Sequence, residues 1–253
     1  MMRTGTRSDL NGQFLADKPE NLARPLMVEI LGPAGAGKTT LASALCQRNG
    51  KAVIAEIPGA RTVRNAPFFL KNGLALSPMF LRQPANGRRL TWREIKMMIH
   101  ANGWYELLYQ QAPSGNSVIL LDHGPVYRVV GLREFGPQIT KSDSFMDWRD
   151  KTLALWASHL DLVVSLDAPN LVLANRINNR ATPHVVKGRS EQEICDFLTR
   201  YRRSYAEAIS YLVGLKDAPR VLHFDTHKEG QGQITESVLH ALNSISRTRT
   251  NRP

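Results

Sequence analysis

The chain has 253 residues, of which 42% are hydrophobic and 22% are charged, and its formal net charge is +11. Such a composition indicates a globular protein that can bury a sizeable core, and no apolar stretch is long enough to cross a bilayer. Only two cysteines occur, Cys46 and Cys195, with no C-x-x-C pair, which argues against a disulfide framework and a zinc site; a cytoplasmic location without a membrane partner is expected.

The first predicted element is a strand–loop–helix unit. Residues 1–24 are polar, lack the apolar core of a signal peptide and are expected to form a flexible leader. An apolar run, Leu26–Leu31, ends in a glycine, and the pattern Gly-x4-Gly-Lys-Thr follows over Gly32–Thr39. A helix-forming stretch, Leu41–Gln47, comes next. This order predicts a P-loop and a bound nucleoside triphosphate.

Each part of the P-loop has a defined chemical role. Its glycines let backbone N–H groups approach a phosphate closely, because a Cβ atom would obstruct the loop. Lys38 places a cation on the β- and γ-phosphates, and the Thr39 hydroxyl can ligate Mg²⁺. We therefore expect ATP and Mg²⁺ as ligands. The residues expected to hold the nucleotide are consecutive: Gly32, Pro33, Ala34, Gly35, Ala36, Gly37, Lys38, Thr39 and Thr40.

Four further strands and several helices follow along the chain. Apolar runs predict strands at 52–57, 117–122, 160–167 and 220–225. Helices are predicted at 91–111, 126–135, 143–159, 170–178, 191–212 and 234–245, the first of them with a capping box formed by Thr91 and Glu94. Residues 57–116 are too many for a simple crossover and predict an acceptor-side insertion. A basic tail, 247–253, is expected to be mobile.

Strands alternating with helices predict an α/β fold, a three-layer P-loop NTPase architecture over residues 25–246. Its sheet should have five, mostly parallel, strands with helices on both faces. Ligands of such sheets bind beyond the carboxyl ends of the strands. Gly32, Glu56, Asp122 and Asp167 all fall at predicted strand ends. We therefore expect these four residues on the same edge of the sheet.

The positive charge is concentrated in two segments. Between residues 61 and 96 there are eight basic residues and one acidic residue, and between 176 and 203 there are seven basic and three acidic residues. Such segments can attract a polyanion such as RNA, or can hold the phosphates of a small molecule. For most of the individual residues, a solvated helix face is the simpler interpretation.

The chain resembles the P-loop nucleoside and nucleotide kinases, most nearly the thymidylate kinase-like group, over roughly residues 26–245. The loop 180–190 looks like the lid segment of that family. The other matching parts are the P-loop, Glu56-x-Pro58-Gly59, the acid Asp122, and Leu166-Asp167-Ala-Pro169 followed by Arg176 and Arg180. Only the P-loop is specific by itself, and the other parts occur in the expected order.

The resemblance implies an Mg²⁺/ATP-dependent phosphotransferase acting on a nucleoside, a nucleotide or another small hydroxylated metabolite. Lys38 would hold the donor, while Thr39 and Asp122 would organise the metal. Glu56 would accept a proton from the acceptor hydroxyl, with Asp122 as the alternative base. The residues that would close over the transferring phosphoryl group are Arg176, Arg180, Lys187 and Arg189.

The chain departs from the family pattern at the end of the third strand. The family usually has Asp-Arg or Glu-Arg there, whereas this chain has Asp122-His123-Gly124-Pro125. His123, Arg128 or a lid arginine would have to replace the missing guanidinium group. If the acceptor carries a phosphate, Arg61 or Arg64 would hold it. The sequence does not name the acceptor.

Two other functions stay open. A nucleic-acid kinase or RNA-linked ATPase would use the basic segments, although no aromatic residues are interleaved with them as a base-stacking surface requires. A regulatory NTPase would bind nucleotide without phosphoryl transfer, although the chain lacks an Asn-Lys-x-Asp segment. A small-molecule acceptor is therefore favoured over nucleic acid. Dimers are common in the resembled group, which leaves a homodimer open.

Overall fold

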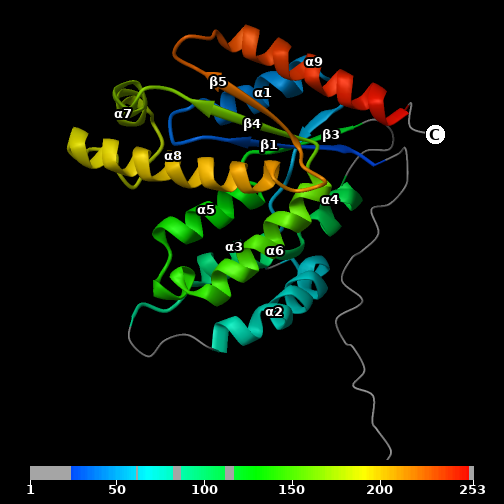
Figure 1. Cartoon of the computed structure of the whole chain (residues 1–253), viewed down its shortest axis with the longest axis vertical. Coiled ribbons are helices and arrows are strands. Elements are labelled where there is room, and N and C mark those ends of the chain that lie inside the picture. Colours follow the sequence, from blue (N-terminus) through cyan, green and yellow to red (C-terminus); the bar gives the residue numbers. More distant parts are fainter. Residues whose placement is uncertain (1–23, 61, 82–86, 112–116, 251–253) are drawn as a thin grey trace, which may run out of the picture.

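The computed structural model describes residues 24–60, 62–81, 87–111 and 117–250, and these form a five-stranded sheet with helices on both faces (Figure 1). The strands are β1 (Leu26–Leu31), β2 (Ala52–Ile54), β3 (Val118–Leu121), β4 (Leu162–Asp167) and β5 (Arg220–Asp225). Their order is β2-β3-β1-β4-β5, and every neighbouring pair is parallel. The predicted α/β fold class is confirmed.

The sheet is the middle of three layers. One core cluster involves α1 (Lys38–Arg48), α7 (Asn170–Asn179) and α9 (Gln231–Thr250). The cluster on the other face involves α2 (Ala66–Leu81), α3 (Trp92–Gly103), α4 (Tyr105–Gln111), α5 (Pro125–Phe135) and α6 (Asp143–His159). Residues of α8 (Glu191–Val213) contribute to both clusters. Two short 3-10 helices, η1 (Val63–Asn65) and η2 (Gln138–Lys141), complete the described elements.

The central strand β1 is buried on both of its faces. Met27 and Leu31 belong to the cluster beneath α5, while Val28 and Ile30 belong to the cluster beneath α1. Side chains alternate between the two faces of a strand, so a parallel strand covered on both sides reads as a continuous apolar run. The exception is Glu29, a fully buried carboxylic acid on the α5 side.

The insertion between β2 and β3 contains a helix that the sequence did not predict. Pro67, Gly73 and Pro78 made this stretch resemble irregular structure, yet α2 spans all three. Pro67 lies in the first turn, where a backbone N–H would have no intrahelical partner, so its missing donor costs little. The helix is held by packing, because its Phe68 and Leu76 enter the core. Residues 82–86, which follow α2 and include Pro84, lie outside the described residues.

Several element boundaries also differ from the prediction. The helix predicted over 91–111 is divided at Trp104 into α3 and α4, and its predicted capping box is confirmed by the reciprocal bonds of Thr91 and Glu94. Strand β2 ends at Ile54, so Glu56 follows it by two residues instead of lying within the predicted strand. These shifts leave the order of the elements unchanged.

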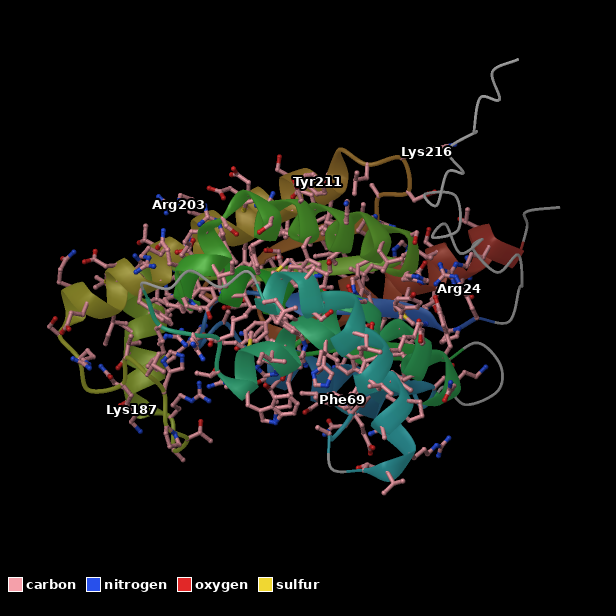
Figure 2. The ribbon with its side chains drawn as sticks, turned by 90° about the horizontal axis from the view of Figure 1, so that it is seen from below. Arg24, Phe69, Lys187, Arg203, Tyr211 and Lys216 are labelled. Atoms are coloured by element: carbon pink, nitrogen blue, oxygen red, sulfur yellow. The ribbon has the colours of Figure 1, made fainter. Side chains whose placement is uncertain are left out.

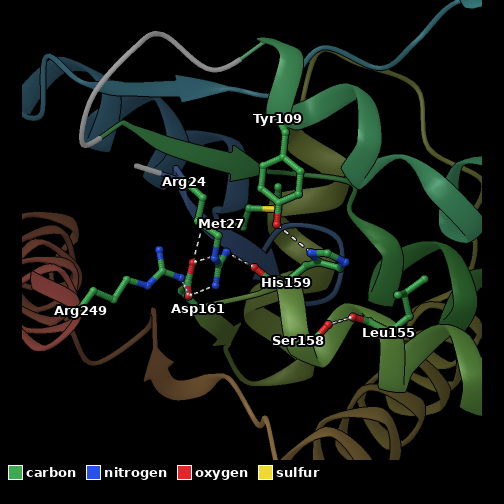
Figure 3. A network of polar contacts seen from close by, with 8 residues as sticks. All are labelled: Arg24, Met27, Tyr109, Leu155, Ser158, His159, Asp161 and Arg249. Carbon is green, nitrogen blue, oxygen red and sulfur yellow. Dashed lines mark hydrogen bonds and ion pairs between the residues drawn. The ribbon is translucent and has the colours of Figure 1, made fainter. Parts of the chain in front are cut away.

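The two ends of the described chain meet at one carboxylate (Figure 3). Arg24, before β1, donates to Asp161 over 3.1 Å, and Arg249 of α9 pairs with the same side chain. The prediction of a mobile tail from residue 247 is therefore wrong as far as residue 250, because α9 continues to Thr250 and is tied to the sheet. Residues 251–253 and residues 1–23 of the predicted leader lie outside the described residues.

Candidate active site

The P-loop has the backbone conformation that its glycines allow. Gly32 has a φ of 143°, and a Cβ atom there would lie 2.2 Å from the carbonyl oxygen of Leu166. Gly37 has a φ of 92° and caps the N-terminus of α1. L-residues with a side chain rarely adopt such φ values. The loop therefore presents backbone N–H groups at the carboxyl end of β1, as the sequence pattern predicted.

Lys38 is folded against the loop that it follows. Its Nζ donates to the carbonyl oxygens of Gly32 at 2.8 Å and Pro33 at 3.0 Å. Burial lowers the pKa of Lys38 to about 8; Asp122 opposes this shift and Arg180 adds to it. A bound phosphate would raise that pKa again, because an adjacent negative charge favours the ammonium form. Lys38 is thus positioned to neutralise phosphate charge.

Thr39 and Asp122 meet across the edge of the sheet. The Thr39 hydroxyl donates to Oδ2 of Asp122 over 2.8 Å, although the two residues are 83 positions apart. The second carboxylate oxygen, Oδ1, is buried without a hydrogen-bond partner among the described residues. One hydroxyl and one carboxylate with a free oxygen are the hard oxygen ligands that Mg²⁺ prefers beside a phosphate. Thr39 and Asp122, the residues predicted to bind the metal, are therefore compatible with Mg²⁺.

The turn that carries Asp122 is held by Glu29, a residue that the sequence analysis missed. Its carboxylate accepts from the backbone N–H groups of Val126 at 3.2 Å and Tyr127 at 2.9 Å, at the start of α5. Burial raises the pKa of Glu29 to about 8, although these two hydrogen bonds oppose the shift. A Cβ atom at Gly124 would lie 2.5 Å from this carboxyl group, so a larger residue there would force the Glu29 side chain to shift. The sequence does contain a signal that could have found Glu29, because it is the single acid in the apolar run Leu26–Leu31.

A cavity of about 370 Å³ lies directly in front of the P-loop. It is lined by P-loop residues including Lys38 and Thr39, together with Asp122 and His123. Its lining also includes four aromatic side chains: Tyr127, Phe197, Tyr201 and Tyr205. Burial lowers the pKa of His123, so its imidazole is neutral at pH 7. The sequence analysis placed no aromatic residue in the site, because α5 and α8 meet only in the folded chain.

A second cavity, of about 260 Å³, lies on the other side of the P-loop. It is lined by residues of α1, β4, α7, the β5–α9 turn and α9, among them Thr40, Leu41, Arg176, Thr226 and Gln231. Arg176 borders both cavities, and its guanidinium group donates to the oxygens of Gly35 at 3.2 Å and of Thr226 at 2.8 and 3.0 Å. Arg176 therefore joins the P-loop to the β5–α9 turn.

The predicted lid residues are only partly brought to the site. Arg180 and His184 line the first cavity, and Arg180 donates to Thr182 over 2.5 Å. Lys187 is exposed and contacts the carbonyl oxygen of Arg180, whereas Arg189 is exposed and pairs with Glu193 at 3.7 Å. Neither Lys187 nor Arg189 is among the residues that line the described cavities.

The acceptor-side residues have varied positions. Glu56 and Arg64 are exposed and are not among the cavity-lining residues, and Arg61 lies outside the described residues. Arg128 is buried, and its guanidinium carbon lies 5.1 Å from the centre of the Trp104 ring. Asp167 pairs with Arg202 through a 2.5 Å contact, so it stabilises the end of β4. The predicted common edge of the sheet is confirmed for Gly32, Asp122 and Asp167, which end or follow parallel strands, but only Gly32 and Asp122 of these line the larger described cavity.

No protein-family model and no curated protein sequence matches this chain. Among solved structures, a deoxyadenosine kinase from M. mycoides with bound dCTP is similar, with a TM-score of 0.50 and 18% sequence identity. That similarity covers 87% of this chain and 100% of that chain. A thymidylate kinase from Candida albicans has a TM-score of 0.51 and 15% identity, covering 88% of this chain and 94% of that chain.

Sequence identities this low indicate a shared fold and not a shared activity, so the chemistry of the site depends on the residues of this chain. Among the described helices, none is sufficiently long and apolar to span a bilayer. The chain has the P-loop nucleotide kinase fold, of the thymidylate kinase-like type.

Proposed function

We propose that this chain is an Mg²⁺-dependent phosphotransferase that transfers the γ-phosphoryl group of ATP to a nucleoside, a nucleotide or another small hydroxylated metabolite. This proposal is supported by the cavity in front of Lys38 and the Thr39–Asp122 pair, whose lining also includes aromatic rings. The charged and hydroxyl groups can hold phosphates and a cation, while the aromatic side chains can stack a planar ring. Both similar solved structures are kinases.

The donor would occupy both sides of the P-loop. Its phosphates would lie over the backbone N–H groups at the start of α1, next to Lys38. Its base would enter the smaller cavity, between Leu41 and Thr226. Arg176 borders both cavities, so it can hold the loop and turn together while its charge faces the triphosphate.

Thr39 and Asp122 would hold the metal beside the β- and γ-phosphates. When bound, Mg²⁺ neutralises phosphate charge and fixes the geometry of the triphosphate. Asp122 has one carboxylate oxygen on the Thr39 hydroxyl and one without a partner in the part of the chain that the structure describes, which leaves it an oxygen for this task. Lys38 and Arg180 supply the positive charge around the transferring group.

The acceptor would lie in the larger cavity, with its ring against Tyr127, Tyr201 or Phe197. Its hydroxyl or phosphate oxygen would approach Asp122, the alternative base of the sequence analysis, which lines the cavity; Glu56, the base expected first, is exposed and is not among the lining residues. We therefore assign the acceptor-side carboxylate to Asp122. A volume of about 370 Å³ is in the range of small-molecule sites.

The test is a coupled assay of ADP release with Mg²⁺ and ATP against nucleosides, nucleoside monophosphates, sugars and short RNA. Stimulation by a small hydroxylated molecule, together with formation of its phosphorylated product, is the expected result. Stimulation by RNA alone would replace this function with that of a nucleic-acid-linked ATPase. A protein that binds ATP tightly but shows no acceptor-dependent release would instead be a regulatory nucleotide-binding protein.

A further inference from the structure

Helix α2 has a second apolar side that is exposed in the described part of the chain. Its inner side places Phe68 and Leu76 in the core, where they are 5% and 3% exposed. On its outer side, Leu70, Leu74 and Leu81 are 65%, 63% and 84% exposed. Figure 1 shows α2 as the outermost helix, on the side of the molecule away from α9. Because a helix that is apolar all round is ordinarily buried all round, the outer side indicates an interaction surface.

The exposed side of α2 is one continuous stripe. Residues spaced by three or four positions lie on the same face of a helix. Pro67, Leu70, Leu74, Pro78 and Leu81 have this spacing, and all five are exposed. We call these five residues the apolar stripe. None of them lines either described cavity, so the stripe is separate from the candidate active site.

The segments around the apolar stripe are basic. The described residues between 62 and 96 include one acidic residue and six basic residues: Arg64, Lys71, Arg88, Arg89, Arg93 and Lys96. Two of these cations are paired, Arg88 with Glu94 at 2.6 Å and Lys71 with Glu106 at 2.7 Å. The other four have no ion-pair partner among the described residues, and three of them belong to η1 and α3, which pack against α2. A partner of this surface must therefore be apolar against the leucines and anionic beside them.

A second copy of the chain does not have these properties. A two-fold contact would bring two sets of like charges together. With its 16 residues, α2 is about 24 Å long and about 10 Å across, so it offers roughly 240 Å² to a second copy. A stable interface buries about 800 Å² on each partner. RNA would match the charge, but it would place phosphates and sugars against the leucines.

The surface of an anionic lipid bilayer has both properties. An interfacial helix lies in the plane of the membrane, with its apolar side among the acyl chains and its basic neighbours near anionic headgroups. We propose that the apolar stripe of α2 and the basic residues around it form a peripheral docking surface for an anionic membrane. This contact requires no spanning helix. It goes beyond the proposed function and adds a partner that the sequence analysis did not expect, because the exposure of α2 follows only from tertiary packing.

Sedimentation with lipid vesicles tests this proposal on the full chain and needs no substrate. At low salt, the wild-type protein should bind vesicles of phosphatidylcholine mixed with phosphatidylglycerol. It should bind vesicles of pure phosphatidylcholine at least about tenfold more weakly, because the anionic headgroups are missing. Raising the salt concentration to about 0.5 M should weaken binding to the mixed vesicles, because salt screens the attraction between exposed charges.

Variants of the apolar stripe separate lipid insertion from charge. Leu70→Gln and Leu74→Gln introduce a good helix former at exposed positions, so α2 should persist, and far-ultraviolet circular dichroism checks this. Each should weaken binding to the mixed vesicles by about tenfold, because less apolar area leaves water. Leu171→Gln is the matched control, at a leucine of α7 that is 59% exposed, and should bind as the wild type does. The comparison of the two lipid compositions needs no variant.

Several results would overturn the proposal. Absence of binding to the mixed vesicles at low salt would exclude an anionic bilayer as the partner. Binding that Leu70→Gln and Leu74→Gln leave unchanged would place the contact elsewhere on the protein. A wild-type dimer in light scattering that Leu74→Gln converts to a monomer would assign the stripe to a second copy, and RNA binding weakened by the same change would assign it to nucleic acid. None of these measurements depends on phosphoryl transfer, so they stand apart from the test of the proposed function.

Discussion

Among the described residues, Lys38 donates hydrogen bonds to the carbonyl oxygens of Gly32 and Pro33. A bound triphosphate would offer it anionic oxygens, and charge-assisted bonds to such oxygens are stronger than bonds to neutral carbonyls. Lys38, which we propose holds the donor phosphates, is therefore tied to the protein through its own loop.

Lys38→Ala should consequently reduce turnover by about a thousandfold or more, since charge stabilisation of the transferring group is lost. The fold should stay intact, because the lysine contacts its own loop. ADP release and far-ultraviolet circular dichroism measure the two effects. Activity near that of the wild type would show that the donor site has been misplaced, whereas a loss of helical signal would assign Lys38 a structural role.

Glu29 should make the stability of the protein depend on pH. Its pKa is about 8 in the folded chain, above the ordinary value of 4.5 expected when unfolded. The folded state thus holds a proton that the unfolded state has released. The stabilisation is complete below about pH 4.5 and is lost as pH rises toward 8, by up to about 1.4 kcal/mol per pH unit.

Glu29→Gln should flatten this dependence, because an amide does not titrate in this range. Urea denaturation of both proteins at pH 5, 6, 7 and 8 measures it. Equal slopes of unfolding free energy against pH would contradict the assigned pKa. Glu29→Leu, which leaves the N–H groups of Val126 and Tyr127 unpaired, should cost about 1–3 kcal/mol at pH 5, where Glu29 is protonated in the folded chain, and this cost should fall as pH rises.

At the scale of elements, the predicted lid segment 180–190 connects α7 to α8 beside the larger cavity. Arg180 lines the cavity, whereas Lys187 and Arg189 are on the exposed part of the loop. If this segment closes over the donor, as the family resemblance implies, the exposed part must move inward. Loops that cover bound nucleotides commonly move in this way.

Mg²⁺ and ATP should therefore slow tryptic cleavage after Lys187 and Arg189. The matched control is Lys216, an exposed lysine in the turn between α8 and β5; Figure 2 shows it on the opposite side of the molecule from Lys187. Mass spectrometry of timed digests measures both sites. Unchanged cleavage at the lid would refute closure, and equal protection at Lys216 would indicate a general rise in stability instead.

The elements that the sequence predicted well are those with strong periodicity. The strands and the helices α5 to α8 lie within a few residues of their predicted positions, because buried apolar runs and capping residues are local signals. Helix α2 was missed for the complementary reason. Its Pro67, Gly73 and Pro78 disfavour a helix locally, and only the packing of Phe68 and Leu76 into the core stabilises it.

At the scale of the whole molecule, Asp161 connects the start of β1, the start of β4 and the end of α9. Its carboxylate is 8% exposed and accepts from Arg24, Arg249 and the backbone N–H of Met27 (Figure 3). Removing one member of such a cluster lowers the free energy of unfolding, because the remaining charges stay buried without their partner.

Asp161→Ala should lower the free energy of unfolding by about 3 kcal/mol or more, and Arg249→Ala by about 1 kcal/mol, since Arg24 still pairs with the carboxylate. Arg247→Ala, an exposed arginine on the same helix, is the matched control and should change stability by less than about 0.5 kcal/mol. Urea denaturation measures all three. An Arg249→Ala effect as small as that of the control would mean that the pair does not stabilise the end of α9.

Site residues that are close together in the sequence could be predicted, whereas those that come together only through folding could not. The strand–loop–helix conformation of the P-loop could be predicted because its pattern lies in nine consecutive residues, whose glycines have the positive φ angles that the loop requires. Asp122 was found because it directly follows an apolar strand. The aromatic lining residues Tyr127 and Tyr201 could not be found, because nothing local indicates that α5 and α8 face one cavity.

By itself, the sequence determined the fold class, the position of the nucleotide loop and the pairing of Thr39 with a strand-end acid, because these depend on local pattern and on the parallel sheet. Only the tertiary structure decided which cations reach the cavity, where Glu29 is buried, and that Arg128 lies against Trp104. The physical reason is that desolvation and hydrogen-bond satisfaction depend on every neighbouring element at once, and residues distant in the chain supply those neighbours only after folding.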